Sequence, residues 1–460
     1  MKFFVPALLF VAAAQAVPAG LPSDADIKRI LVERIETERQ GVGIVIGVID
    51  ANGKRTISHG HVDTAGSRPV DADTVFEIGS ATKAFTALLL ADAVQRGEVS
   101  LTDPIAKYLP SEVKTPERGG KAITLIDLAT HTSGLPRLPS NLKPADARNP
   151  YADYTTAQLH AFLSSYELPR DIGAQYEYSN YGAGLLGHLL ARRAGVDYET
   201  LVTTRIAQPL KMTSTAVTLT DPLRRRLATG HNAGRQPVMN WDLPALAGAG
   251  ALRSTANDML AFLSAYLGYT PSPLSQAMEA TLAVRRPTAS PTMEIALGWH
   301  VLKTPGGKEI VWHNGGTGGY RSFVGFDRAS RTGVVGLSNV STQAGVDDIG
   351  RHILDRSLPL VKTTPPAVRK EIDVAPEILD RYVGKYQLAP TFVITVTREE
   401  KQLYVQATAQ PRFEVFATAE REFFLKAVNA SITFETDADG RAIALVLHQN
   451  GIDQRAKRID

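Results

Sequence analysis

The chain has 460 residues, of which 44% are hydrophobic and 21% charged, and its formal net charge is +3. This composition is that of an ordinary globular protein, long enough for more than one domain, and the small net charge with only short basic runs does not indicate a nucleic-acid-binding surface. The chain has no cysteine, which excludes disulfides, cysteine catalysis and thiolate metal sites.

The start of the chain has the pattern of a secretory signal peptide, which we assign to residues 1–16. Lys2 precedes an apolar run, and the small-residue cleavage site Ala14-Gln15-Ala16 follows it. The run is too short to span a bilayer. The sequence therefore predicts cleavage after Ala16 and a periplasmic or secreted mature protein, the alternative being a retained anchor or a buried first helix.

The next segments predict a helix and a hairpin. Residues 24–40 have the pattern of an amphipathic helix, and residues 41–50 form a β-branched run that ends in a turn at Asn52-Gly53. Residues 55–61 can pair back on this run as the second strand of the hairpin.

Residues 75–97 combine a short strand with a helix that starts at a serine. An apolar strand over residues 75–78 leads into Ser80, after which apolar residues recur with helical spacing until Gly97 ends the helix. Ser80 and Lys83 lie one turn apart on the same face, so the amine can reach the hydroxyl as the base of a nucleophile. The alternative is that Ser80 only caps the helix and that Lys83 is an exposed residue of its first turn.

The region from residue 101 to about 269 is predicted to be mainly helical, with proline-rich loops. Within it, Tyr178-Ser-Asn180 precedes a glycine-rich helix whose small residues permit close packing against a neighbour. This is the only Y-x-N in the chain. Taken alone, it is also compatible with a plain helix entry capped by Asn180.

Beyond residue 270 the pattern changes to strands, which are predicted at residues 298–303, 309–313, 321–327 and 333–339, with a helix at 346–358. Between two of these strands lies the segment WHNGGTGGY, from Trp312 to Tyr320. Its glycines permit a ligand to approach the backbone closely and leave N–H groups free to bind it. A flexible hairpin is the alternative.

The end of the chain predicts a separate small all-β domain. Residues 359–376 contain Pro365-Pro366 and are interpreted as a linker, and residues 377–460 form the predicted domain, an antiparallel barrel or sandwich. Its strands are predicted at residues 392–396, 403–407, 413–416, 423–425, 432–434 and 443–447. No catalytic group of residues is evident in this part of the chain.

Three motifs occur in a fixed order: Ser80-Ala-Thr-Lys83, Tyr178-Ser-Asn180 and His313-Asn-Gly315. This order resembles the signature of the serine β-lactamase and penicillin-binding-protein family. It is most similar to the branch that contains class C β-lactamases, D-alanyl-D-alanine carboxypeptidases, D-aminopeptidases and related esterases. The sequence around the motifs, from about residue 41 to 358, is also similar to that family.

The resemblance implies an α/β (α+β) fold for residues 24–358. In this fold an antiparallel sheet, with strands from both ends of the domain, is flanked by helices, and a helical subdomain is inserted. The active site would lie between the sheet and the helices. The domain formed by residues 377–460 resembles the small barrel-like domains that are appended to some family members.

The resemblance also implies roles for the motif residues. Ser80 would attack a carbonyl and form an acyl-enzyme, with Lys83 and Tyr178 sharing the proton transfers. The backbone N–H groups of Ser80 and Gly316 would form the oxyanion hole. The residues expected to bind the substrate are Asn180, His313, Gly315, Gly316 and Thr317.

One residue departs from the pattern of many relatives. His313 stands where many β-lactamases and carboxypeptidases carry lysine, and the chain contains no K-T-G. Lysine offers a permanent charge to a substrate carboxylate, whereas histidine is mostly neutral at pH 7 unless its surroundings favour protonation. The sequence therefore leaves open how a substrate carboxylate is held.

The family resemblance implies a secreted or periplasmic serine hydrolase with no metal or organic cofactor. Its expected substrates are D-amino-acid peptides of the peptidoglycan type, cleaved by carboxypeptidase or endopeptidase action, or β-lactams. The alternatives are an esterase of the same family that acts on small acyl esters, and a non-catalytic peptide-binding module. We expect small-molecule or peptidoglycan-fragment partners, no nucleic acid, and no integral membrane span after signal cleavage.

Overall fold

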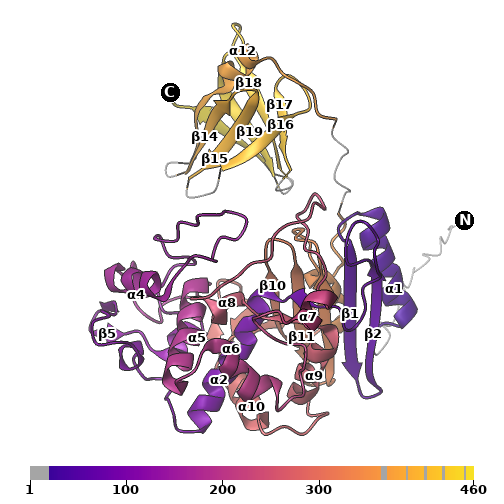
Figure 1. The fold of residues 1–460 in the computed structure, drawn as a ribbon, viewed down its shortest axis with the longest axis vertical. Coiled ribbons are helices and arrows are strands. Elements are labelled where there is room, and N and C mark those ends of the chain that lie inside the picture. Colours follow the sequence, from indigo (N-terminus) through magenta and orange to yellow (C-terminus); the bar gives the residue numbers. More distant parts are fainter. Residues whose placement is uncertain (1–19, 364–369, 390–391, 409–411, 427–429, 450–451) are drawn as a thin grey trace, which may run out of the picture.

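The computed structural model describes the chain except for residues 1–19, 364–369, 390–391, 409–411, 427–429 and 450–451. The predicted signal peptide and a central part of the predicted linker therefore lie outside the described residues. Figure 1 shows that the described residues form a larger unit of strands and helices and a smaller unit of strands.

The larger unit is built on an eight-stranded sheet with the order β2-β1-β12-β11-β10-β9-β8-β7. All of its paired neighbours run antiparallel. The strands are β1 (Gly43–Asp50), β2 (Gly53–Gly60), β7 (Arg286–Pro287), β8 (Met293–Ile295), β9 (His300–Lys303), β10 (Glu309–Gly316), β11 (Arg321–Asp327) and β12 (Thr332–Ser338). Because β1 pairs with β12, segments from the two ends of the unit lie side by side in the sheet, as predicted.

Helices cover both faces of this sheet, which explains why β1 is apolar throughout instead of alternating. Ile44, Ile46 and Val48 of β1 pack with α1 (Asp24–Val32) and α11 (Asp347–Leu354) on one face. The intervening Val45 and Ile49 join the larger core on the other face, which contains α9 (Ala256–Tyr266). The predicted helix at the start of the chain continues past α1 as a π-helical turn, η1 (Glu33–Thr37).

A mainly helical region surrounds α2 (Thr82–Gln95), which is buried along nearly its whole length. Gly97, with φ of 67°, ends this helix as predicted. The helices of this region are α3 (Leu125–Ala129), α4 (Thr156–Ser165), α5 (Asn180–Ala194), α6 (Tyr198–Val202), α7 (Asp221–Arg226), α8 (Ala247–Gly250) and α10 (Ser275–Ala283). A Cβ atom on Gly187 of α5 would lie 2.8 Å from the Cα of Gly248 in α8, so the close packing predicted for the glycine-rich helix is confirmed.

Four short strands, two 3-10 turns and the π-helical turn η4 (Thr203–Ala207) complete the larger unit. Strand β3 (Phe76–Glu77) pairs with β6 (Arg253–Ser254), and β4 (Glu117–Arg118) pairs with β5 (Lys121–Ala122). The 3-10 turns are η2 (Gly79–Ala81), which joins β3 to α2, and η3 (Ile105–Tyr108). The β3–β6 pair matters for function because it anchors the segment that enters α2 through η2.

The smaller unit is a closed antiparallel barrel, one of the two architectures that the sequence predicted. It has its own core, in which Tyr382 stacks on Phe434 with a ring-centroid distance of 4.5 Å. Its strands are β13 (Gly384–Ala389), β14 (Phe392–Glu399), β15 (Gln402–Ala407), β16 (Arg412–Ala417), β17 (Glu422–Leu425), β18 (Ala430–Thr436), β19 (Ala442–Gln449) and β20 (Ile452–Arg458), preceded by α12 (Pro376–Leu379). Strands β13 and β20, which pair to close the barrel, were not among the predicted strands, and β20 is largely polar in sequence.

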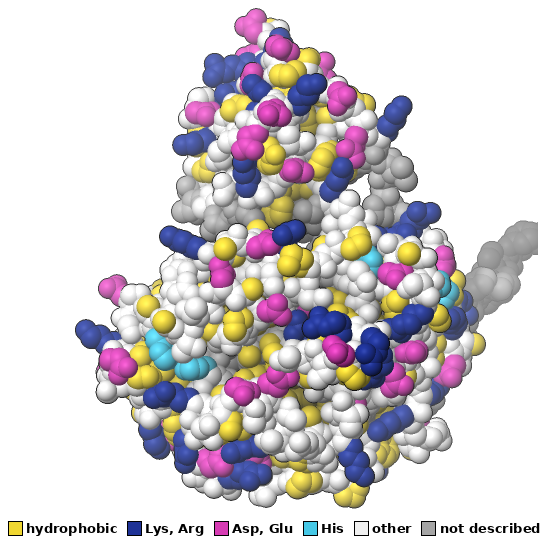
Figure 2. Space-filling view, viewed as in Figure 1, with side chains coloured by type: hydrophobic (Ala, Val, Ile, Leu, Met, Phe, Trp, Pro, Cys, Tyr) yellow, Lys and Arg dark blue, Asp and Glu magenta, His cyan; other side chains and the backbone are white. Residues whose placement is uncertain are grey.

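The surface carries charges of both signs. On the face shown in Figure 2, Lys and Arg side chains lie interspersed with Asp and Glu over both units, in accord with the net charge of +3. Among the helices of the described residues, none is long and apolar enough to cross a membrane.

Candidate active site

Ser80 lies in the turn η2 between β3 and α2. The preceding Gly79 has a φ of 49°, a left-handed conformation that other residues rarely adopt. A Cβ atom at Gly79 would also lie only 2.7 Å from the backbone nitrogen of Gly316. Gly79 is thus required for two reasons, and the close approach brings the end of β10 next to the Ser80 backbone.

Lys83 lies one turn further along, and its side chain is directed into the protein. The residue is only 2% exposed, and its Nζ lies 3.0 Å from Ser80 Oγ, 2.9 Å from Asn180 Oδ1 and 2.7 Å from the carbonyl oxygen of Ala249. The alternative of an exposed first-turn lysine is therefore wrong. The third predicted motif adjoins the first at Gly79, next to Ser80, and the second reaches Lys83 through Asn180.

Burial, with a further contribution from the charge of Arg137, lowers the pKa of Lys83 well below its usual value. A neutral amine has two N–H groups and a lone pair. The two N–H groups can donate to Asn180 and Ala249, which leaves the lone pair directed at the Ser80 hydroxyl. This arrangement suits Lys83 to accept the proton of Ser80.

Tyr178 lies over the same pair of residues. The Lys83 Nζ is 4.8 Å from the centroid of its ring, and the guanidinium carbon of Arg137 is 5.2 Å away on the cleft side. Burial raises the pKa of Tyr178 above its usual range, and a hydrogen bond with Ser80 partly opposes this shift. Tyr178 therefore keeps its proton at neutral pH, whereas Lys83 is biased towards losing one.

Asn180 is the first residue of α5 and does not cap it, contrary to the simple reading of its motif. The cap is Ser179, whose side chain accepts a 2.8 Å hydrogen bond from the Gly182 N–H. The Asn180 side chain is thereby left for the site, where its Oδ1 accepts from Lys83. Asn180 also lines the cleft, so its Nδ2 is placed to meet a ligand.

The third motif forms the end of β10, opposite β11. Asn314, Gly315, Gly316 and Thr317 line the cleft, but His313 is fully buried behind its wall. Burial, together with the nearby His300 and Lys83, lowers the pKa of His313 well below its usual value. His313 is therefore neutral and offers no charge to a substrate.

Two more histidines, which the sequence analysis did not single out, pack around Tyr178. The ring centroids of His131 and Tyr178 are 4.6 Å apart, and His131 Nδ1 accepts a hydrogen bond from the Ser179 N–H. His300 Nε2 lies 3.0 Å from the hydroxyl of Tyr176. Burial lowers the pKa of His131 well below its usual value and that of His300 to about 4, so this cluster is neutral and holds the tyrosines in place.

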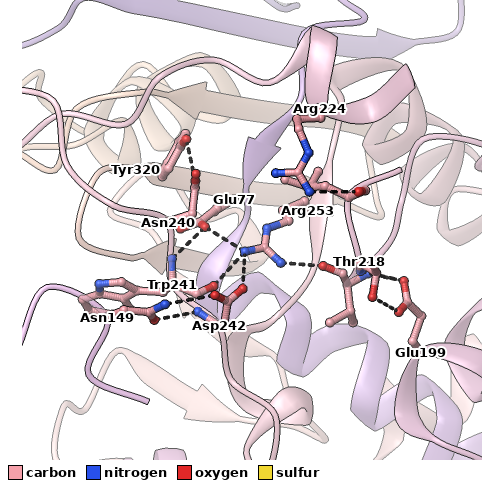
Figure 3. Close-up of polar contacts among 12 residues, drawn as sticks. Glu77, Asn149, Glu199, Thr218, Arg224, Asn240, Trp241, Asp242, Arg253 and Tyr320 are labelled. Atoms are coloured by element: carbon pink, nitrogen blue, oxygen red, sulfur yellow. Dashed lines mark hydrogen bonds and ion pairs between the residues drawn. The ribbon is translucent and has the colours of Figure 1, made fainter. Parts of the chain in front are cut away.

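A polar network behind Ser80 supports one wall of the cleft (Figure 3). Glu77 of β3 accepts hydrogen bonds at Oε1 from the Trp241 N–H, at 3.0 Å, and from Arg253, at 3.2 Å. Arg253 also binds the Trp241 carbonyl oxygen and Asp242. Burial raises the pKa of Glu77, and the charge of Arg253 opposes this shift. The network holds the backbone at Trp241 in place. The ring centroids of Trp241 and Tyr151 are 5.4 Å apart.

The resulting cleft has a volume of about 810 Å³. Ser80, Tyr178 and Asn180 lie in it, and Tyr151 and Trp241 form an aromatic wall. Two arginines, Arg137 and Arg321, also line it. The sequence analysis missed both arginines, although Arg321 directly follows the segment from Trp312 to Tyr320 that it singled out.

The described part of the chain contains no group of three or more histidine, aspartate or glutamate side chains placed to hold a metal ion.

The sequence profile of the family described as Beta-lactamase matches residues 29–356. The chain belongs to the β-lactamase family. A second profile, described as a domain of unknown function (DUF3471), matches residues 368–458. The family assignment, the fold and the classification as a serine hydrolase are thus confirmed.

Individual relatives agree with this assignment. The chain is 32% identical over 297 residues to the D-alanyl-D-alanine-carboxypeptidase/endopeptidase AmpH of Escherichia coli (strain K12), covering 61% of this chain and 75% of AmpH. It is 26% identical over 424 residues to penicillin-binding protein 4* of Bacillus subtilis (strain 168), covering 87% and 91%. The structure of a β-lactamase/D-alanine carboxypeptidase from Yersinia pestis complexed with citrate superimposes with a TM-score of 0.64 and 26% identity, covering 74% of this chain and 99% of that one.

Proposed function

We propose that this β-lactamase-family hydrolase is an exported carboxypeptidase or endopeptidase that cleaves D-amino-acid peptides of the peptidoglycan type through an acyl-enzyme on Ser80. The observation that carries the proposal is the buried Lys83, whose Nζ lies 3.0 Å from Ser80 Oγ and whose pKa is lowered well below its usual value. A relative with 32% identity, AmpH, is named as a D-alanyl-D-alanine carboxypeptidase and endopeptidase.

Acylation begins when neutral Lys83 accepts the proton of Ser80 and Ser80 Oγ attacks the carbonyl carbon of the scissile amide. The carbonyl oxygen gains negative charge, which the N–H groups of Ser80 and Gly316 stabilise, and Asn180 Nδ2 binds a neighbouring amide of the substrate. When the C–N bond breaks, the leaving nitrogen must receive a proton.

Tyr178 is the residue that delivers this proton. It retains its hydroxyl proton at neutral pH, and it lies against both Lys83 and Ser80. Tyr178 gives its proton to the leaving nitrogen and regains one from Lys83, so the proton taken from Ser80 ends on the released amine. Deacylation reverses the path: water loses a proton to the Lys83–Tyr178 pair, its oxygen attacks the ester, and Ser80 is reprotonated.

The size and walls of the cleft support a peptide substrate. A volume of about 810 Å³ lies within the range of pockets that enclose ligands larger than an acetyl ester. Tyr151 and Trp241 offer an apolar surface to the acyl part of the substrate. A peptide or peptidoglycan fragment is therefore the proposed partner, and the leader pattern at the start of the chain supports export to where such partners occur.

One observation favours a second candidate, an esterase of the same family. His313 is neutral, so the third motif provides no permanent charge for the carboxylate of a peptide or a β-lactam. A small ester needs the same nucleophile and oxyanion hole but no such charge. The two candidates differ in whether a free carboxylate on the substrate improves cleavage.

The test is intact-protein mass spectrometry and D-alanine release from an acyl-D-Ala-D-Ala peptide, with Ser80→Ala as the matched variant. We expect D-alanine release and a penicilloyl adduct from the wild type, and neither from the folded Ser80→Ala protein. Cleavage of p-nitrophenyl acetate without D-alanine release or a penicillin adduct would support the esterase. Undiminished activity of Ser80→Ala would disprove the assignment of the nucleophile.

A further inference from the structure

Arg321 is the first residue of β11 and lies opposite Gly316, the last residue of β10. The absence of a side chain at Gly316 makes room for the Arg321 guanidinium, because a Cβ atom there would collide with Nη1. Gly345 packs in the same way on the aliphatic part of the arginine, with its hypothetical Cβ 3.2 Å from Arg321 Cγ. Two glycines therefore hold the guanidinium at the edge of the cleft, which it lines.

Arg321 donates three hydrogen bonds within the protein, and the two from its Nη atoms are long. Nε donates to the carbonyl oxygen of Thr342 at 2.9 Å, Nη2 to that of Ser341 at 3.3 Å and Nη1 to that of Tyr320 at 3.4 Å. All three acceptors are neutral, and a guanidinium has five N–H donors, so two remain for a ligand. Arginine keeps its charge when partly buried, and such a charge is costly without an anionic partner.

No carboxylate of the described residues supplies that partner within the ion-pair distance of 4.0 Å. Asp347 is close enough to interact electrostatically with Arg321, but its Oδ2 accepts a hydrogen bond from Asn314 instead. Most of the well-buried arginines of the larger unit do have such a partner; Arg253, for example, pairs with Glu77. Arg321 is thus a positioned cation that forms no direct ion pair with a described carboxylate, and it faces the cleft that contains Ser80.

Its distance from the nucleophile suits the leaving group of a peptide. Gly316 contacts Arg321 on one side and Gly79, next to Ser80, on the other. In a peptide with a free C-terminus, the carboxylate carbon of the last residue lies three bonds, or roughly 3–4 Å, from the scissile carbonyl carbon. A substrate whose carbonyl is held by the Gly316 N–H therefore extends its carboxylate towards the guanidinium.

We propose that Arg321 is the residue that binds the C-terminal carboxylate of the substrate, by a charge-assisted hydrogen bond from β11. It performs this role because the third-motif side chain, His313, is buried and lies outside the cleft. The inference rests on the proposed peptidase function and defines its substrate class: D-amino-acid peptides, or β-lactams, with an unblocked carboxylate. Arg137, the other arginine of the cleft, is exposed to solvent, which screens its charge.

The test compares two substrates that differ only in that carboxylate: an acyl-D-Ala-D-Ala peptide and its C-terminal amide. In the wild type we expect the acid to be preferred. Arg321→Gln should reduce the ratio of kcat/KM for the acid to kcat/KM for the amide about ten- to a hundredfold, the usual effect of losing a hydrogen bond to a charged group. Arg321→Lys, which retains the charge, should keep more of this ratio than Arg321→Gln.

Two other arginines serve as controls. Arg328 lies just beyond the far end of β11, is exposed and pairs with Glu279, so Arg328→Gln should leave the ratio unchanged. Arg137→Gln should change it less than Arg321→Gln. An unchanged ratio in folded Arg321→Gln, or a larger loss in Arg137→Gln, would overturn the proposal.

A binding measurement separates this inference from the proposed function. Isothermal titration calorimetry with N-acetyl-D-alanine and with its amide needs no turnover. If neither peptide is cleaved but the acid binds at least about tenfold more weakly to Arg321→Gln than to the wild type, the carboxylate site is supported and the peptidase function is disproved. If the peptides are cleaved but the acid binds equally to both proteins, or to neither, the assignment of Arg321 is wrong.

Discussion

The two walls of the cleft each hold a basic residue that is shielded from water, but with opposite consequences. On the helical wall, Lys83 of α2 is 2% exposed, and burial lowers its pKa well below the usual value. On the sheet wall, burial also lowers the pKa of Arg321, but from a starting value so high that the guanidinium stays charged. The same physical effect therefore produces a base on one wall and a fixed charge on the other.

The two sides of the cleft therefore have different roles in catalysis. We call the side with Lys83 and Tyr178 the lysine wall, and the side with Gly315, Gly316 and Arg321 the arginine wall. The lysine wall moves protons, and the groups around it, Tyr178 and the buried histidines, are uncharged at neutral pH. The arginine wall is made of glycine backbone and one cation, and it holds the substrate in place. Changes on the lysine wall should therefore alter the rate of the chemical step, and changes on the arginine wall should alter substrate affinity.

The largest effect is expected for Lys83→Met, which retains the apolar stem and removes the base. The rate of acylation should fall roughly 10²- to 10⁴-fold, the usual contribution of a positioned acid or base. The burst of p-nitrophenol from p-nitrophenyl acetate in stopped flow measures this rate. The matched change on the other wall, Arg321→Met, should mainly raise KM for substrates with a free carboxylate. An equal loss of the burst rate in both variants would contradict the different roles of the two walls.

A smaller loss, in stability, is expected for Arg253→Met behind the aromatic wall. It leaves Glu77 buried without its partner, and breaking such a pair costs roughly 3–5 kcal/mol of the free energy of unfolding. All three tryptophans of the chain lie in the larger unit, so urea unfolding followed by tryptophan fluorescence reports on that unit. The double variant Glu77→Gln/Arg253→Met should recover part of the loss, and equal stability of Arg253→Met and wild type would refute the role of the pair.

The sequence predicted the nucleophile and the base of the lysine wall better than the cation of the arginine wall, because Ser80 and Lys83 lie close together in the sequence. Ser80 and Lys83 are brought together by a single helical turn, and Gly79 and Gly97 punctuate the segment, so the nucleophile and its base were predictable. Most strands of the sheet were also predictable from apolar runs, and the family resemblance implied that strands from both ends of the domain join in one antiparallel sheet. The nucleophile, its base and the individual strands depend on neighbours in the sequence, whereas the pairing of β1 with β12 does not.

Arg321 could not be predicted in this way. Its importance depends on Gly316 across a strand pair, on Gly345 from a loop that follows β12, and on the absence of a carboxylate partner. The burial of His313 likewise depends on packing against His300 and Tyr178 from distant segments. A sequence pattern identified the third motif but not which of its side chains faces the cleft.

The buried lysine also predicts a pH dependence of stability. The folded-state pKa of Lys83 is lower than its unfolded value, so between these two values the unfolded chain binds more protons. The free energy of unfolding of the wild type, relative to Lys83→Met, should therefore rise with pH above the folded pKa, by at most about 1.4 kcal/mol per pH unit. The rise should level off near 10.5, the ordinary pKa of lysine. Urea unfolding at pH 7, 8 and 9 measures this difference, and a falling difference would contradict the buried lysine.

The smallest expected effect concerns Asp347 beside the proposed carboxylate site. Burial raises its pKa to about 6, opposed by the hydrogen bond from Asn314 and by the charges of Arg351 and Arg321, with Asp348 acting in the same direction as burial. Above pH 6 its negative charge repels a substrate carboxylate, so N-acetyl-D-alanine should bind roughly two- to threefold more weakly at pH 7.5 than at pH 5.

Asp347→Asn should remove this dependence, because the ligand stays ionised over the whole interval and the low pKa values of His131, His300 and His313 keep these side chains neutral. Calorimetric titrations of both proteins at the two pH values measure the effect. A pH dependence that persists in Asp347→Asn would show that another group sets the affinity. Loss of the pH dependence would mean that the buried carboxyl of Asp347 controls how strongly Arg321 binds the ligand.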